Sequence, residues 1–269
     1  MNLVGDIIMY TKEYLTDQLI KMGIEPTDTV AIHTSMKAIG DVDGGADTLL
    51  DVFIEYLIDG LFIVPTHTWE NVNKESPLFD VNKTKPCIGI VPTIAAFHPR
   101  GIRSLNPTHS VAAFGRRAKS YIARDLEFET PTHPQGCWGK LYDENAKILL
   151  IGVGQDRNTF LHAVDEIIDM PERLTDELIP YQVRLYDGRI VERPMRRHYN
   201  PHTNDVSQFF TKFDDAFAYH NAVEIGEFGN AKVQICNARI CAKVFKNIMN
   251  KSDKDLCVDD LPIPDEFYK

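Results

Sequence analysis

The order of hydrophobic and polar positions along the chain alternates between patterns typical of strands and patterns typical of helices. Short apolar runs predict buried strands at residues 30–33, 61–65, 147–153 and 232–236. Helical spacing of apolar residues predicts helices over residues 11–22, 46–58, 112–126, 209–219 and 238–250, whereas residues 91–98 fit either structure. Residues 181–191, with Asp187-Gly188 between two arms, predict a hairpin. This order predicts an α/β fold with a mixed central sheet sandwiched by helices.

Two polar excursions interrupt the pattern, at residues 67–86 and 193–206. Loops of this length in a compact domain often cover a functional site. No segment has the composition of a linker, so we expect one domain over residues 1–269.

Composition and charge restrict the class of protein. A hydrophobic content of 43% and a charged content of 25% are typical of a globular domain. The formal net charge of −10 argues against nucleic acid as a partner; it suits a cationic ligand, or it only keeps the protein soluble. The five cysteines are spread out and form no CxxC pair, which favours reduced thiols. Without a signal peptide or an apolar run of ~20 residues, we expect no membrane segment and a cytoplasmic location.

The most informative segment is ILLIGVGQDRNTFLHAVDE, residues 148–166. It predicts a strand, a glycine turn and a helix that begins near Phe160 after Asn158 or Thr159 as the N-cap. His162 would lie in the first turn, with Asp165 and Glu166 three and four residues later on one helical face. A carboxylate there could fix the imidazole in one tautomer and make it a general base, although a capping role for His162 and a solvated role for the carboxylates remain open.

Two other polar motifs follow predicted strands, where α/β sheets bind ligands. Residues 30–40 form a possible phosphate cradle, but their spacing matches neither a Walker loop nor a dinucleotide fingerprint. The second motif is LFIVPTHTW at residues 61–69, and a polar loop at residues 103–115, expected to enter a helix, repeats its Pro-Thr-His triplet. No HxH pair and no carboxylates interleaved at ligand spacing support a metal site, and no GxSxG elbow supports a serine hydrolase, so we predict no metal.

In order and spacing, these segments resemble the aminoglycoside 3-N-acetyltransferase family, which differs in fold from the GNAT acetyltransferases. The resemblance covers most of the chain and rests on HTS at residues 33–35, Ile39-Gly40, Gly44-Gly45, Pro65-Thr66, RSLNPTHS at residues 103–110, Gly115, Thr130-Pro131, LLIGVG at residues 149–154, Asn158-Thr159 with His162, Ile225-Gly226 and GNA at residues 229–231.

The resemblance implies transfer of an acetyl group from acetyl-CoA to the 3-amino group of an aminoglycoside, with His162 as the general base. Asp165 stands where the family usually has glutamate, so Asp165 and Glu166 are both candidates for the partner of His162. The implied cofactor contacts are His33, Thr34, Ser35, Met36, Lys37, Pro65, Thr66, Arg103, Ser104, Asn106, His109 and Ser110.

The acceptor is less well defined, because RRHYNPH at residues 196–202 resembles only one branch of the family. We expect its contacts among Trp69, Asp165, Glu166, His198 and Asp205. The alternatives are a CoA-dependent acetyltransferase of another small amine and a non-enzymatic module that binds CoA or a sugar.

Overall fold

The computed structural model describes residues 2–4 and 7–269. Its strands are β1 (Asn2–Val4), β2 (Ile7–Met9), β3 (Thr29–Thr34), β4 (Leu61–Pro65), β5 (Leu78–Asp80), β6 (Ile102–Arg103), β7 (Val111–Phe114), β8 (Lys147–Ile151), β9 (Gln182–Arg184), β10 (Ile190–Glu192), β11 (Val223–Phe228) and β12 (Ala231–Asn237).

The helices are α1 (Lys12–Lys21), α2 (Met36–Ile39), α3 (Gly45–Tyr56), α4 (Ile90–Ala96), α5 (Ala118–Ile122), α6 (Lys140–Asp143), α7 (Thr159–Ile167), α8 (Asp214–Tyr219) and α9 (Ala238–Met249), with 3₁₀ turns η1 (Asp125–Glu127), η2 (Gln155–Arg157), η3 (Val206–Phe213) and η4 (Asp265–Phe267).

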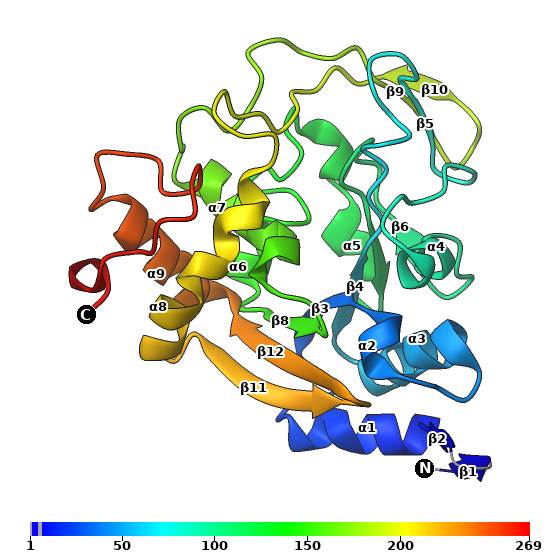
Figure 1. Cartoon of the computed structure of the whole chain (residues 1–269). Helices are drawn as coiled ribbons and strands as arrows, with labels where there is room; N and C mark the ends of the chain where they lie inside the picture. The colour runs from blue at the N-terminus through cyan, green and yellow to red at the C-terminus, as the bar shows by residue number, and fades with distance from the viewer. Residues whose placement is uncertain (1, 5–6) are drawn as a thin grey trace.

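A seven-stranded mixed sheet in the order β11-β12-β8-β3-β4-β7-β6 forms the centre of the molecule (Figure 1). Only the β8-β3 and β3-β4 pairs are parallel, and the other neighbours are antiparallel. The parallel strands are buried over almost their whole length and mostly apolar, because both of their faces are covered. The α/β/α fold predicted from the sequence is confirmed.

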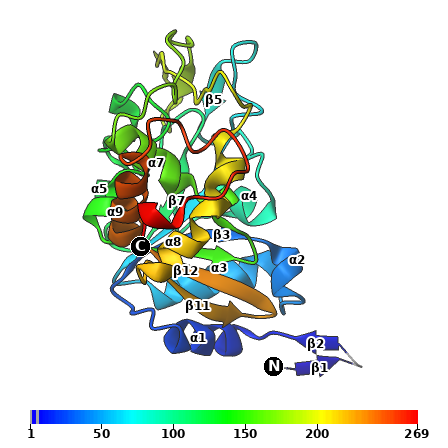
Figure 2. The ribbon, with the colours of Figure 1, turned by 60° about the vertical axis from the view of Figure 1, so that its left-hand side comes forward.

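Side chains of the central strands alternate between two hydrophobic cores, as the pleat requires. Ala31 and Ile148 face one core, to which α7 and α9 contribute, and Val30 and Leu149 face the other, beneath α1 and α3. Figures 1 and 2 show these helix groups on opposite sides of the sheet, with the small β10-β9-β5 sheet beyond one end of it. No helix in the described part of the chain is long and apolar enough to span a membrane.

The prediction of one helix over residues 112–126 was wrong. Strand β7 occupies Val111–Phe114 and pairs with β4, and Gly115 turns the chain into the short helix α5. Gly115 has a φ of 97°, and a Cβ there would lie 2.6 Å from the carbonyl oxygen of Gly60. All four residues of β7 are buried, so the alternation of apolar and polar residues that marks a half-exposed strand is absent.

Other elements differ less from the predictions. Residues 91–98, which fitted either structure, are mostly in helix α4, and the predicted helix over residues 209–219 is the 3₁₀ turn η3 followed by α8. Strand β11 was not predicted, because its residues are largely exposed at the sheet edge and only partly apolar. The predicted hairpin is confirmed as β9 and β10.

Candidate active site

A cavity of about 760 Å³ lies at the carboxyl ends of the parallel strands β3, β4 and β8. Its wall includes the end of β3, the end of β4, the turn after β8 and the start of α7, together with residues of the excursions at 67–86 and 193–206. The carboxyl ends of adjacent parallel strands are the usual ligand site of an open α/β sheet. The cavity is also within the size range of small-molecule sites.

Local sequence places His162 at this cavity. Strand β8 ends at Ile151. The next residue, Gly152, has a φ of 68° and packs so closely on Ala38 that an added Cβ would lie 2.3 Å from the Ala38 Cβ. The chain then passes through η2 to Asn158, whose carboxamide oxygen accepts a hydrogen bond from the backbone N–H of Phe160 at 3.2 Å and caps α7. His162 is the fourth residue of α7, is partly exposed, and lines the cavity.

Four imidazole rings extend from His162 into the molecule. The ring of His162 stacks on that of His198 with centroids 4.4 Å apart and an interplanar angle of 21°. His198 is 4.8 Å from His109 in an edge-on arrangement, and His109 is 4.6 Å from His67. We refer to His162, His198, His109 and His67 as the histidine row; all but His67 line the cavity.

Burial keeps several of these rings in the neutral form. Burial lowers the pKa of His162 well below its ordinary value, and the neighbouring His198, Arg173 and His67 lower it further. Burial likewise lowers the pKa of His109 and of His67. A neutral imidazole is the form that can accept a proton.

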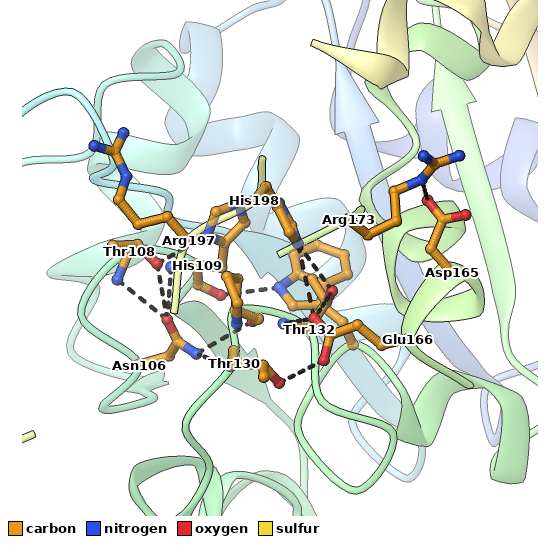
Figure 3. Close-up of polar contacts among 12 residues, drawn as sticks. Asn106, Thr108, His109, Thr130, Thr132, Asp165, Glu166, Arg173, Arg197 and His198 are labelled. Atoms are coloured by element: carbon orange, nitrogen blue, oxygen red, sulfur yellow. Dashed lines mark hydrogen bonds and ion pairs between the residues drawn. The ribbon is translucent and has the colours of Figure 1, made fainter. Parts of the chain in front are cut away.

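Asp165 and Glu166, the two candidate partners of His162, contact other groups. Asp165 is 1% exposed and accepts a hydrogen bond from Nε of Arg173 at 3.0 Å, while the far end of Arg173 forks onto Asp255. Burial raises the pKa of Asp165 to about 6, although Arg173 opposes the rise. Figure 3 shows this pair to one side of the groups around Glu166.

Glu166 has a different set of donors. One of its carboxylate oxygens accepts hydrogen bonds from the hydroxyl of Thr132 at 2.6 Å and from the Thr132 backbone N–H at 2.9 Å, and the other accepts from the hydroxyl of Thr130 (Figure 3). Nε2 of His198 lies 3.7 Å from Glu166 Oε1. Burial acts to raise the pKa of Glu166, but His198 and the threonine hydroxyls lower it on balance. Within the described part of the chain, no hydrogen bond joins His162 to either carboxylate.

The predicted cofactor residues divide into two groups. Those that line the cavity are His33, Thr34, Pro65 and His109. The others do not contribute to its wall; these are Ser35, Met36, Lys37, Thr66, Arg103, Ser104, Asn106 and Ser110. The Ser35 hydroxyl instead caps α2 by accepting a hydrogen bond from the backbone N–H of Ala38.

Arg103 shows why residues of the second group do not reach the cavity wall. It is 2% exposed, and its guanidinium donates hydrogen bonds to the carbonyl oxygens of Thr84 and Thr66 and to the hydroxyls of Thr66 and Ser110. Burial lowers its pKa to about 10, so the group stays charged at neutral pH. With its donors directed at protein oxygens, Arg103 holds parts of the fold together, and its contact with the cofactor stays a prediction.

Asn106 also has protein partners. Its carboxamide oxygen accepts from the backbone N–H of Thr108 and of His109, and its amide group donates to the carbonyl oxygen of Pro131 at 3.2 Å. It therefore fixes the loop that carries His109, which lines the cavity.

Of the predicted acceptor residues, Trp69, His198 and Asp205 line the cavity, whereas Asp165 and Glu166 lie behind its wall. Asp205 caps η3 by accepting a hydrogen bond from the backbone N–H of Ser207 at 2.9 Å. The described residues include no group of three or more His, Cys, Asp or Glu side chains arranged to hold a metal ion.

Sequence reasoning missed three residues of the site. Arg173 and Arg197 line the cavity, and Thr132 links Glu166 to the histidine row. Thr132 follows the Thr130-Pro131 motif and Arg197 lies in the RRHYNPH motif, so both belong to segments that the family resemblance marks. Nothing in the sequence marked Arg173 as a site residue. One of its partners, Asp255, is distant in the chain, and the burial of the other, Asp165, is not visible in the sequence.

A mixed sheet with a cavity at its strand ends, lined by a partly exposed histidine on the following helix, is typical of an α/β protein that binds a small molecule at this edge of the sheet. Comparison with known proteins specifies it further. The family model described as aminoglycoside 3-N-acetyltransferase matches residues 31–250. The chain therefore belongs to the aminoglycoside 3-N-acetyltransferase family and is an acyltransferase of that type, as predicted.

Individual relatives are distant. The SPbeta prophage-derived aminoglycoside N(3')-acetyltransferase-like protein YokD of Bacillus subtilis (strain 168) is 23% identical over 84% of this chain and 87% of its own length. Aminoglycoside N(3)-acetyltransferase VII of Streptomyces paromomycinus is 27% identical over 72% of each chain.

Solved structures show the same fold. The crystal structure of YokD from Bacillus subtilis superposes with a TM-score of 0.78 at 21% identity, covering 92% of this chain and 97% of that one. The structure of AAC-IIIb in a binary complex with CoASH gives a TM-score of 0.78 at 18% identity, covering 92% and 99%.

Proposed function

We propose that this protein is an acetyl-CoA-dependent N-acetyltransferase of the cytoplasm in which His162 is the general base. The observation that carries the proposal is the position of His162: it lines the strand-end cavity, has no hydrogen bond to the carboxylates of its own helix, and is kept neutral by burial. An alkyl amine is mostly protonated at neutral pH, so a group that accepts its proton is needed, and a positioned base typically contributes ~10²–10⁴-fold.

The cavity wall is suited to the pantetheine arm of the cofactor. Ile32, Val64, Ile88 and Pro92 provide apolar surface, and His33 has a buried Nε2 atom without a hydrogen-bond partner among the described residues. When bound, acetyl-CoA supplies the activated acetyl group. The residues proposed to contact it are now the lining members of the predicted set, namely His33, Thr34, Pro65 and His109.

The first candidate acceptor is an aminoglycoside, acetylated on its 3-amino group. The family supports this choice, and one solved relative of the same fold is AAC-VIa bound to sisomicin. Trp69, His198 and Asp205 are the proposed contacts, because they line the cavity.

A second candidate acceptor is another small amine with fewer positive charges. The cavity wall contains three carboxylates, of Glu70, Asp156 and Asp205, and as many arginines. Arg157 is paired with Asp156 at 3.2 Å and Arg173 with Asp165, whereas Arg197 has no side-chain partner within the described residues. A polycation would meet this free guanidinium, and a monoamine would be repelled less.

Release of free CoA thiol tests the proposal and ranks the two acceptors. We expect release from acetyl-CoA with an aminoglycoside panel or, if the second candidate holds, with monoamino sugars and small amines. His162→Ala should lower kcat by at least ~10²-fold and leave the Kd of acetyl-CoA nearly unchanged.

The matched control is His202→Ala, since His202 is a largely exposed histidine outside the cavity wall. It should keep full turnover. A His162→Ala enzyme with near-normal kcat would remove the base assignment, and acetyl-CoA binding without thiol release for any amine would favour a non-enzymatic binding module.

A further inference from the structure

The ring of His162 is held by rings from other segments. His198 covers one side of it at 4.4 Å, and the edge of Phe210 from η3 lies 5.1 Å from it at an interplanar angle of 61°. Neither Asp165 nor Glu166 hydrogen-bonds to it within the described residues. The orientation of the proposed base therefore depends on how firmly His198 is placed.

The side chain of His198 is fixed by Thr132. Its Nε2 atom lies 3.2 Å from the Thr132 hydroxyl oxygen, and that hydroxyl gives its only proton to Glu166 at 2.6 Å. The hydroxyl oxygen can then only accept from the imidazole, so Nε2 of His198 carries a proton directed at Thr132 and Glu166. Figure 3 shows the three side chains converging.

The backbone on both sides of His198 is also anchored. His198 forms a β-bridge with Leu174, the N–H of Tyr199 donates to the carbonyl oxygen of Arg173 at 3.0 Å, and the N–H of Arg196 donates to the carbonyl oxygen of Glu129 at 2.8 Å. A ring held at its backbone and at Nε2 provides a rigid surface for a stacked neighbour.

We propose that His198 is the positioning residue of His162, held in place by Thr132 and Glu166, so that the base is oriented by a stacked imidazole and not by a carboxylate on its own helix. The inference rests on the proposed role of His162 as the base. On this proposal, His198 orients His162 and is no longer expected to bind the amine acceptor. Glu166 then acts on His162 indirectly, by helping to hold His198.

The charged and titratable groups facing His162 come from several segments. His198 and Arg173 lie on the segments that follow α7, His67 follows β4, and His109 precedes β7. Asp165 and Glu166 are on α7 itself, and their carboxylates are bonded to other groups. Removal of the ring of His198 takes away one neighbour that lowers the pKa of His162 and admits water to its face. Both changes move the pKa of His162 toward its ordinary value.

The test compares His198→Phe, which keeps a flat ring but cannot donate to Thr132, with His198→Ala, which loses the stack as well. His198→Ala should lower kcat roughly tenfold with the acceptor KM within about twofold, and His198→Phe should retain more of kcat because a ring still covers His162. His202→Ala is the control and should match the parent enzyme.

An NMR titration of the imidazole signal of His162 gives a readout that needs no turnover. The midpoint should rise in His198→Ala, and rise less in His198→Phe. A raised acceptor KM with unchanged kcat and unchanged His162 midpoint would overturn the inference and return His198 to the acceptor site. If no amine releases thiol, the proposed function fails, and the NMR comparison still decides whether His198 positions His162.

Discussion

Two polar clusters lie close to the strand-end cavity, and each contains residues that were predicted as parts of its binding site. In the Arg103 cluster, the guanidinium donors reach oxygen atoms of Thr66, Thr84 and Ser110. In the histidine row, His162 has no such partner within the described residues, and three of the four rings line the cavity. What separates Arg103 from His162 is whether the polar atoms of the side chain are already bonded to the protein.

The Arg103 cluster joins parts of the fold that are distant in sequence. Its guanidinium lies over the rings of Phe79 at 4.8 Å and Phe97 at 5.7 Å. The hydroxyl of Tyr186, from the turn between β9 and β10, accepts from the backbone N–H of Arg103 and donates to its carbonyl oxygen, both at 2.8 Å. The cluster thus ties the small sheet to the edge of the central one.

Of the substitutions that test this difference, Arg103→Met should have the largest effect on stability. The substitution removes the guanidinium donor of the Thr84 carbonyl oxygen and one of the two donors of the Thr66 carbonyl oxygen, which keeps the Ser110 hydroxyl. We therefore expect the free energy of unfolding to fall by about 3 kcal/mol in urea titrations. The Kd of acetyl-CoA for the folded protein should stay the same.

Arg116→Met is the matched control, because the Arg116 side chain is 77% exposed, and it should change stability by less than about 0.5 kcal/mol. Full stability of Arg103→Met together with a weakened Kd for acetyl-CoA would reverse the comparison and support the predicted cofactor contact.

The second prediction concerns the two adjacent carboxylates of α7. Glu166→Gln removes the charged acceptor of Thr132 and loosens His198, so we expect kcat to fall about tenfold. Asp165→Asn leaves Arg173 paired with Asp255, so it should lower stability by roughly 1–2 kcal/mol and change kcat less than twofold.

The sequence alone favoured the opposite ranking, because Asp165 occupies the family's glutamate position. Steady-state kinetics with urea titrations of both variants decide between the two. A larger loss of kcat in Asp165→Asn would make that carboxylate the partner of His162 after all.

Much of the scaffold around the cavity could be predicted from local patterns. The apolar runs that became β3, β4 and β8, the Asn158 cap and the position of His162 on α7 depend on neighbours in sequence. Strand β7 could not be predicted, because its pairing with β4 comes from a segment almost fifty residues away.

The contacts that define the site also join segments that are distant in sequence. Thr132, Glu166 and His198 come from segments more than thirty residues apart, so no spacing rule relates them. The burial of Arg103 depends on Phe79 and Tyr186, which lie in other segments of the chain. The sequence predicted that His162 lies at the start of a helix after a strand, as it does on α7, but it could not show which of its neighbours have their polar atoms satisfied.

The smallest predicted effect is a difference between buried histidines and Arg103 in how they make the free energy of unfolding depend on pH. His33 and His67 are buried and nearly unexposed, and burial lowers the pKa of His33 to about 3 and that of His67 well below 6.5. The unfolded chain therefore binds protons below pH 6.5 that the folded protein does not, and the free energy of unfolding should fall as the pH drops from 6.5, at up to roughly 1.4 kcal/mol per pH unit for each ring. Arg103 stays charged over this range and contributes no slope.

Asp165 works in the opposite direction, because its pKa is raised to about 6: its contribution is present at low pH and is lost as the pH rises through 6. Urea titrations between pH 8 and pH 5 should still show a net loss on acidification, since these two rings, together with those of His109 and His162, outweigh one carboxyl. His67→Phe keeps a ring against His109 and removes one titrating group, so its slope should be flatter by about one proton. An unchanged slope would mean that His67 is protonated in the folded protein, and the contrast with Arg103 would then lose its electrostatic basis.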